Sequence, residues 1–257
     1  MKQAEGLTGA AKTLADAGKI KIGVKVDQPG IGYREPGADA PAGFDIEMGR
    51  IIAGRLGIDD DGIEWVETVS DNREPFLQNG TVDLVLASYS ITDDRRKVVG
   101  QAGPYYETGQ QLLIRKDSEG DITGPEDLAS VKTCSVEGST SLARVEDEYG
   151  ASPVPFATYS ECVEQLENKT VDAVTTDGAI LLGYAAQNPD ELVVVGDPFS
   201  TERYGVGYNK DAEGMCDFLN ETLQASFDDG SWAETFAATL GKSDVETPGT
   251  PTLDPCP

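Results

Sequence analysis

The sequence predicts an α/β protein of two lobes, each with a mostly parallel sheet covered by helices. The chain has 257 residues, enough for one large domain or two of about 100–150 residues. Strand-like and helix-like apolar patterns alternate, and the alternation restarts near the middle of the chain. The motif L-x-N-x-T-V-D-x-V occurs twice, within residues 77–88 and 166–177. The repeat lies at equivalent points of the two runs, which indicates two lobes built on the same plan.

The first run predicts three strands separated by helices. Residues 20–26 alternate apolar side chains with lysine or glycine, which is the period of a strand. Apolar side chains recur on one helical face of residues 43–57, where Gly57 can end the helix. The elements expected in order are a helix at 8–18, a strand at 20–26, a Gly- and Pro-rich loop at 27–43, a helix at 43–57, a strand at 63–69, a helix at 73–80 and a strand at 81–88.

The second run begins after residues 105–117 and follows the same pattern. It predicts strands at 131–138, 170–177 and 191–196, with helices at 139–150, 157–168 and 179–188. An extended segment at 200–211, helices at 213–227 and 231–240, and a tail rich in Pro and Thr from 243 complete the chain.

The charge balance excludes two classes of partner. There are 46 acidic and 20 basic residues, a formal net charge of −26. Nucleic acids and anionic membrane surfaces attract basic proteins, so neither is an expected partner. No apolar run reaches the length of a membrane span. The first 19 residues lack the apolar core of a signal peptide, so either the protein is cytosolic or a targeting segment has been removed ahead of it.

Histidine and cysteine narrow the chemistry further. The chain has no histidine, which excludes Ser-His-Asp and Cys-His catalysis and His-ligated metal sites. The four cysteines, Cys134, Cys162, Cys216 and Cys256, form no CxxC pair. They are either buried free thiols or two disulfides. The even count and the position of Cys256 in a Pro-rich tail favour disulfides, and hence a compartment outside the cytoplasm. Three pairings are possible, of which we favour sequence neighbours, Cys134–Cys162 and Cys216–Cys256.

The repeated motif selects two site candidates. It aligns Ser88 with Asp177, each at the carboxyl end of a predicted strand, where ligands of open α/β sheets bind. Ser90 and Arg95 follow Ser88, and a guanidinium with hydroxyls around it suits a small carboxylate. Alternatively, Arg95 is an exposed helix residue that pairs with Asp93 or Asp94.

The second run offers groups of both signs. Ser139 and Thr140 open a predicted helix, whose free N–H groups favour an anion, although such a sequence can also be a simple helix cap. Asp177 suits an ammonium group, or else caps the helix that follows it. An anion site and an ammonium site together match the two ends of an α-amino acid.

Two further cations lie at strand ends. Lys25 ends the first strand, and Arg73 opens the helix after the second. Each is either a solvated charge or part of a positive pocket that selects a second carboxylate on the ligand.

The chain resembles the amino-acid-binding solute-binding proteins of ABC transporters, which have the type II periplasmic-binding-protein fold. The resemblance covers about residues 8–240 and rests on GFDIEMGRIIAGRLG, QNGTVDLVLASYSITDDRRKVVGQAGPYYETG, VEGSTS and TVDAVTTDGAIL. It implies that Arg95 binds the ligand α-carboxylate, that Asp177 binds its ammonium, and that Ser88, Ser90, Ser139 and Thr140 complete the clamp. The segment VSDNREPFLQNG is similar to the acidic-amino-acid branch of the family, and IKIGVKVDQPGIGYRE is similar to actinobacterial glutamate-binding proteins.

In the acidic-amino-acid branch, the residue matching Arg73 meets the side-chain carboxylate of the ligand, and Lys25 falls where that branch can also carry a cation. Candidates for an aromatic residue that covers the ligand are Tyr33, Tyr159 and Tyr204, of which Tyr159 is included in the predicted site.

The same resemblance implies an organisation and a function. Lobe 1 would comprise residues 1–112 and 202–257, lobe 2 residues 113–201, with hinge strands near 110–115 and 199–206 and helices on both faces of each sheet. The expected function is capture of L-glutamate by a monomer for the permease of an ABC importer, with no cofactor or metal. The protein would act outside the cytoplasm, held to the cell membrane by a lipid on a removed N-terminal segment. Alternatives are aspartate, glutamine or another amino acid as ligand, or a dehydratase-type enzyme.

Overall fold

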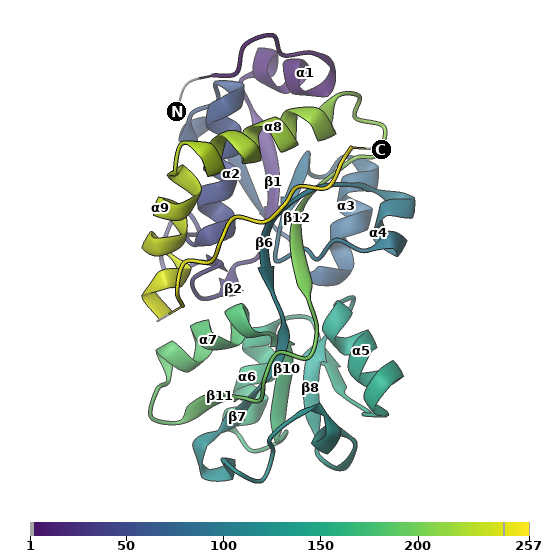
Figure 1. Cartoon of the computed structure of the whole chain (residues 1–257), viewed down its shortest axis with the longest axis vertical. Coiled ribbons are helices and arrows are strands. Elements are labelled where there is room, and N and C mark those ends of the chain that lie inside the picture. The colour runs from purple at the N-terminus through teal and green to yellow at the C-terminus, as the bar shows by residue number, and fades with distance from the viewer. Residues whose placement is uncertain (1–2, 244, 257) are drawn as a thin grey trace.

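The computed structural model, which describes residues 3–243 and 245–256, has two lobes stacked along the long axis of the molecule (Figure 1). Each lobe contains a five-stranded sheet. The two-lobed α/β prediction is therefore confirmed. The first sheet has the order β4 (Ile63–Glu67), β1 (Ile20–Val24), β5 (Leu84–Leu86), β12 (Glu202–Tyr208), β6 (Gly100–Thr108). The second has the order β11 (Leu192–Val195), β7 (Gln110–Arg115), β10 (Ala173–Asp177), β8 (Thr133–Val136), β9 (Val154–Phe156).

Strand direction in each sheet follows from how the chain passes between the lobes. Strands β1, β4 and β5 pair in parallel, as do β8, β9 and β10. Strand β12, which returns from the second lobe, is antiparallel to β5 and β6. Strand β7, which enters the second lobe, is antiparallel to β10 and β11. In each sheet, four of the five strands therefore run in the same direction and one, β12 or β7, runs against them, because a strand arriving from the other lobe starts at the edge where the βα strands end. The prediction of mostly parallel sheets is confirmed.

Nine helices of the described residues cover the sheets, and the expected helices are all present. Helix α2 begins at Phe44 as its apolar face predicts, and Gly57 ends it with a left-handed φ of 77°. The helices are α1 (Gly9–Ala17), α2 (Phe44–Leu56), α3 (Arg73–Asn79), α4 (Asp93–Val98), α5 (Thr140–Tyr149), α6 (Tyr159–Glu167), α7 (Gly178–Gln187), α8 (Met215–Asp228) and α9 (Ser231–Ala238).

Three strand features differ from the sequence prediction. The segment expected to be a loop, 27–43, contains the short antiparallel pair β2 (Asp27–Gln28) and β3 (Gly32–Tyr33). Strand β6 had no predicted counterpart, because Gly100, Gly103 and Pro104 interrupt its apolar pattern. Strand β9 is a three-residue edge strand containing Pro155, which gives a weak strand signal.

Both disulfides predicted from the sequence are present. Cys134–Cys162 joins β8 to α6 inside the second lobe, and Cys216–Cys256 joins α8 to the C-terminal tail. The tail runs along the first lobe (Figure 1), where Asp254 pairs with Arg96 and Arg203. Among the described residues, no helix combines the length and apolar character that a membrane span requires.

Candidate functional site

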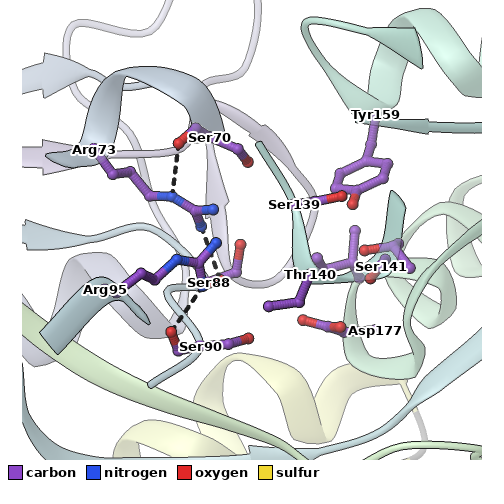
Figure 2. A pocket seen from close by; sticks show the side chains of 12 residues that line it. Ser70, Arg73, Ser88, Ser90, Arg95, Ser139, Thr140, Ser141, Tyr159 and Asp177 are labelled. Atoms are coloured by element: carbon purple, nitrogen blue, oxygen red, sulfur yellow. Dashed lines mark hydrogen bonds between the residues drawn. The ribbon is translucent and has the colours of Figure 1, made fainter. Parts of the chain in front are cut away.

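A small polar cavity lies between the lobes. It is formed where β5 and β10 end, the two strand ends that the repeated motif aligned. Figure 2 shows side chains of α3, α4 and the segment after β5 on one side, and those of α5, α6 and β10 on the other. The lining residues are Ser70, Arg73, Ser88, Ser90, Arg95, Ser139, Thr140, Ser141, Tyr159, Thr176, Asp177 and Ile180. All predicted ligand-binding residues except Lys25 are therefore brought together.

The turn after β5 is held in a strained conformation. Ser88 has a φ of 43°, a region that residues other than glycine adopt rarely. Its N–H donates to Oδ2 of the buried Asp45 across 2.7 Å, and the Tyr105 hydroxyl donates to Oδ1 across 2.6 Å. Burial raises the pKa of Asp45 to about 6. This buried anchor fixes the direction in which Ser88 and Ser90 leave the strand.

Arg73 is a buried cation whose hydrogen-bond partners among the described residues are backbone carbonyls. Its side chain is 2% exposed. Nε donates to the carbonyl of Ser70 across 3.0 Å, and Nη1 donates to those of Ala87 and Ser88. Nη2 reaches across the lobes to the carbonyl of Gly138 across 3.2 Å. Burial, followed by repulsion from Arg95, lowers the pKa of Arg73 to about 10.

Arg95 is the second guanidinium of the pocket. Its Nε pairs with Glu74 Oε1 across 3.0 Å, so it does not form the surface pair with Asp93 or Asp94 that the sequence also allowed. Nη1 donates to the Ser90 carbonyl across 2.8 Å, and Nη2 donates to the Gly138 carbonyl across 3.0 Å. The Thr92 hydroxyl caps α4 by accepting from the Arg95 N–H. Arg95 is thus oriented by both its own helix and α3.

The sequence analysis missed four lining residues, Ser70, Ser141, Thr176 and Ile180. It also missed Tyr89, which contacts both guanidiniums of the site. Its ring is fully buried, and the guanidinium carbons of Arg73 and Arg95 lie 4.7 and 4.9 Å from its centroid. Its hydroxyl donates to Glu74 Oε1 across 2.8 Å. The ring therefore stabilises two neighbouring cations through its π face. The sequence did contain a signal for Tyr89, because an aromatic residue lies between Ser88 and Ser90. In an extended segment, its side chain points to the side opposite the two serines.

The second lobe contributes the start of α5. Ser139 is its N-cap and accepts from the Leu142 N–H, which confirms the capping alternative for that hydroxyl. Thr140 Oγ1 donates to Glu202 Oε2 across 3.0 Å. Ser139, Thr140 and Ser141 all line the cavity. The first N–H groups of α5 therefore start at the cavity wall, which favours negative charge there.

Asp177 supplies the negative charge of the pocket. It occupies the N-cap position of α7, but its side chain makes no capping bond. Oδ2 accepts from the Tyr204 hydroxyl across 2.7 Å, whereas Oδ1 is buried and lacks a partner among the described residues. Burial, followed by repulsion from Glu202, raises the pKa of Asp177 to about 7. An unpaired buried carboxylate oxygen beside a cavity is suited to a cationic group on a ligand.

The three aromatic candidates occupy different places. Tyr159, the first residue of α6, lines the cavity (Figure 2). Tyr204 orients Asp177 from β12. Tyr33 lies in β3 and lines a separate hollow beside α2 and α9 instead.

Lys25 lies behind the cavity wall rather than in it. Its buried Nζ donates to the Ser70 hydroxyl across 2.9 Å, and Ser70 is a lining residue. Burial, followed by repulsion from Arg73, lowers the pKa of Lys25 to about 7. Strand β1 ends at Val24, so Lys25 lies just after the strand. The ammonium of Lys25 therefore adds positive charge behind the cavity wall and contacts that wall through Ser70.

The family model of the bacterial extracellular solute-binding proteins, family 3, matches residues 20–242. The chain belongs to this family. It is thus a solute-binding protein, which supports the predicted binding function over the dehydratase alternative.

Individual members are similar over most of their length. Glutamate-binding protein GluB of Corynebacterium efficiens is 40% identical over 247 residues, which cover 91% of this chain and 83% of that protein. The ABC transporter glutamine-binding protein GlnH of Bacillus subtilis is 33% identical over 235 residues, covering 91% and 85%. An ancestral arginine-binding protein solved with bound glutamine has a TM-score of 0.81 at 32% identity, covering 87% of this chain and 98% of that one.

Proposed function

We propose that this solute-binding protein captures L-glutamate and presents it to the permease of an ABC importer. The observation that carries the proposal is the charge pattern of the cavity. Two buried guanidiniums, Arg73 and Arg95, line one side, and the unpartnered Oδ1 of Asp177 lies on the other (Figure 2). Glutamate carries two carboxylates and one ammonium, which matches two cations and one anion. The GluB relative, named as glutamate-binding, supports the same ligand.

Each end of the ligand then has a proposed partner. Arg95, the Ser88 and Ser90 hydroxyls and the α5 start at Ser139 and Thr140 bind the α-carboxylate. Asp177 accepts from the ammonium. Arg73 binds the side-chain carboxylate, Lys25 adds positive charge behind Ser70, and the Tyr159 ring covers the ligand. A bidentate guanidinium fork suits each carboxylate better than a lysine would.

We propose that ligand binding closes the two lobes, each moving as a rigid body, about the two segments where the chain passes from one lobe to the other. The sequence-based division is 1–112 with 202–257 against 113–201. Strand pairing supports a first bend at Gly109, between Thr108 of the first sheet and Gln110 of the second. It supports a second bend within 196–201, between β11 and β12. Contacts from both lobes hold the ligand, and the closed monomer is the form that the permease receives.

The proposed place of action is outside the cytoplasm. The two disulfides support it, because thiols stay reduced in most cytosols. Anchoring by a lipid on a preceding segment is a separate part of the proposal. Mass spectrometry of the protein isolated from its native cell tests it, since a diacylglyceryl group adds a defined mass.

Calorimetric titration with L-glutamate, L-aspartate and L-glutamine tests the ligand. We expect L-glutamate to bind most tightly, because glutamine leaves the Arg73 charge unmatched and aspartate is one methylene short. Arg73→Lys should weaken glutamate by about 2–5 kcal/mol and glutamine much less. Arg96→Ala is the matched control, because Arg96 lies next to Arg95 but pairs with Asp254 outside the cavity. Tightest binding of glutamine, or equal losses for both ligands in Arg73→Lys, would contradict the proposal.

A further inference from the structure

An acidic side chain of the first lobe contacts the second lobe outside the cavity lining. Asp27 begins β2, three residues after β1 ends. Its Oδ2 accepts from the backbone N–H groups of Tyr159 and Ser160 across 2.9 and 3.3 Å. These are the first two residues of α6 in the second lobe. Asp27 therefore joins the two lobes through a helix start.

Helix α6 has a complete local capping box, which does not bind the backbone N–H groups of Tyr159 and Ser160. Thr158 Oγ1 accepts from the Glu161 N–H, and Glu161 Oε2 accepts from the Thr158 N–H, which is a capping box. A helix start has four N–H groups without helical partners. The box takes the first and the fourth. The second and third, on Tyr159 and Ser160, bind a carboxylate from the other lobe.

A second helix of the same lobe meets the same segment. The Tyr184 hydroxyl of α7 donates to the backbone carbonyl of Asp27 and lies 3.4 Å from its Oδ2. One residue earlier, a Cβ at Gly183 would lie 2.2 Å from the Pro29 carbonyl oxygen. The 27–29 segment therefore fits closely against both α6 and α7, and the absence of a side chain at Gly183 permits that approach.

We propose that Asp27 is a positioning residue for ligand retention: it fixes Tyr159, whose ring lines the cavity, from the opposite lobe once the lobes close. Carboxylate bonds to helix N–H groups are charge-assisted and are favoured by the helix dipole. These bonds exist only when the lobes meet, so they stabilise the closed form and leave the open form unchanged. The inference rests on the proposed function, because it requires a ligand that closes the lobes.

Dissociation kinetics test this role. Radiolabelled L-glutamate is bound, the complex is diluted into unlabelled ligand, and release is followed for the wild type, Asp27→Asn and Asp27→Ala. We expect Asp27→Ala to raise the dissociation rate about tenfold while the association rate changes less than about twofold. Asp27→Asn keeps one acceptor oxygen and should fall between the two. Tyr184→Phe combined with Asp27→Ala should cost less than the sum of the separate effects.

Thr158→Ala is the matched control, because it removes the local cap of the same helix in open and closed forms alike. It should lower the melting temperature of the ligand-free protein, whereas Asp27→Ala should leave that temperature unchanged. An unchanged dissociation rate in Asp27→Ala, or a loss of ligand-free stability as large as that of Thr158→Ala, overturns the proposal. The ligand assignment fails separately: if another amino acid binds more tightly than glutamate, the Asp27 effect is measured with that amino acid.

Discussion

The Tyr204 hydroxyl donates to Oδ2 of Asp177 across 2.7 Å and leaves Oδ1 of the same carboxylate buried without a partner among the described residues. One oxygen of the carboxylate is thus oriented by the protein, and the other is left without a partner in a residue that lines the cavity. Asp45, on the first lobe, shows the opposite arrangement, because both of its oxygens accept hydrogen bonds. The comparison separates a carboxylate that holds the structure from one that is available to a ligand.

Replacing Asp177 by asparagine should stabilise the ligand-free protein and weaken glutamate binding. Its pKa in the folded protein is raised to about 7, so its contribution to stability is present at low pH and is lost as the pH rises through 7. At pH 8, Asp177→Asn should therefore raise the free energy of unfolding of the ligand-free protein by about 1–3 kcal/mol and strongly weaken glutamate. Denaturant unfolding measures the first effect and calorimetry the second. Asp45→Asn, the control, should lower stability instead, because the amide nitrogen cannot accept the hydrogen bond that Ser88 N–H or the Tyr105 hydroxyl donates to Asp45. A loss of stability in Asp177→Asn would contradict this account.

The affinity for glutamate should be greatest near neutral pH. Below pH 7, Asp177 gains a proton and can no longer pair with the ligand ammonium, so the affinity should fall up to about tenfold per pH unit. Above pH 7, Lys25, whose pKa is lowered to about 7, loses its positive charge and favours an anionic ligand less. Titrations from pH 5.5 to 8.5 test both limbs. Asp177→Asn should remove the loss of affinity below pH 7, and Lys25→Met should remove the loss above pH 7. If either loss persists in its variant, a different titrating group causes it.

Sequence patterns could locate the site because its main residues are tied to strand ends. The repeated motif placed Ser88 and Asp177 together, and the two guanidiniums lie on helices that begin beyond β4 and β5, the two strands that flank β1. The same reasoning could not place Lys25 relative to the cavity wall, because residue spacing does not specify the direction of a side chain just after the end of a strand. Its ammonium is directed to Ser70 by tertiary packing.

Other features depend on contacts between segments far apart in sequence. Tyr89 is important because Arg73 and Arg95 meet on its ring, and Glu74 because it binds both Tyr89 and Arg95. Strand β6 forms despite two glycines and a proline, since β12 pairs along it. Local propensity carries none of this information, which explains why these elements were not predicted.

Tyr89 gives a prediction that separates its ring from its hydroxyl. Tyr89→Leu removes the π face shared by the two guanidiniums and should weaken glutamate about tenfold or more. Tyr89→Phe keeps the ring and loses only the bond to Glu74, so it should weaken binding about threefold or less. Calorimetry on both variants provides the comparison. Equal losses would assign the effect to the Glu74 hydrogen bond and not to the ring.

Gly183 offers a test of closure that does not touch the ligand. In the interior of α7, alanine is favoured over glycine by about 1 kcal/mol, so Gly183→Ala should stabilise the ligand-free protein slightly. In the closed form, however, the new Cβ would meet the Pro29 carbonyl oxygen at 2.2 Å, and a backbone atom cannot move aside cheaply. The affinity for glutamate should therefore fall about tenfold or more.

Small-angle X-ray scattering with saturating glutamate is the decisive measurement for Gly183→Ala. The variant should stay more extended than the wild type, whereas Gln187→Ala, an exposed change at the end of the same helix, should close normally. If Gly183→Ala binds and compacts like the wild type, the lobes do not need this approach. In that case, the contact between 27–29 and α7 is not part of the closure that retains the ligand.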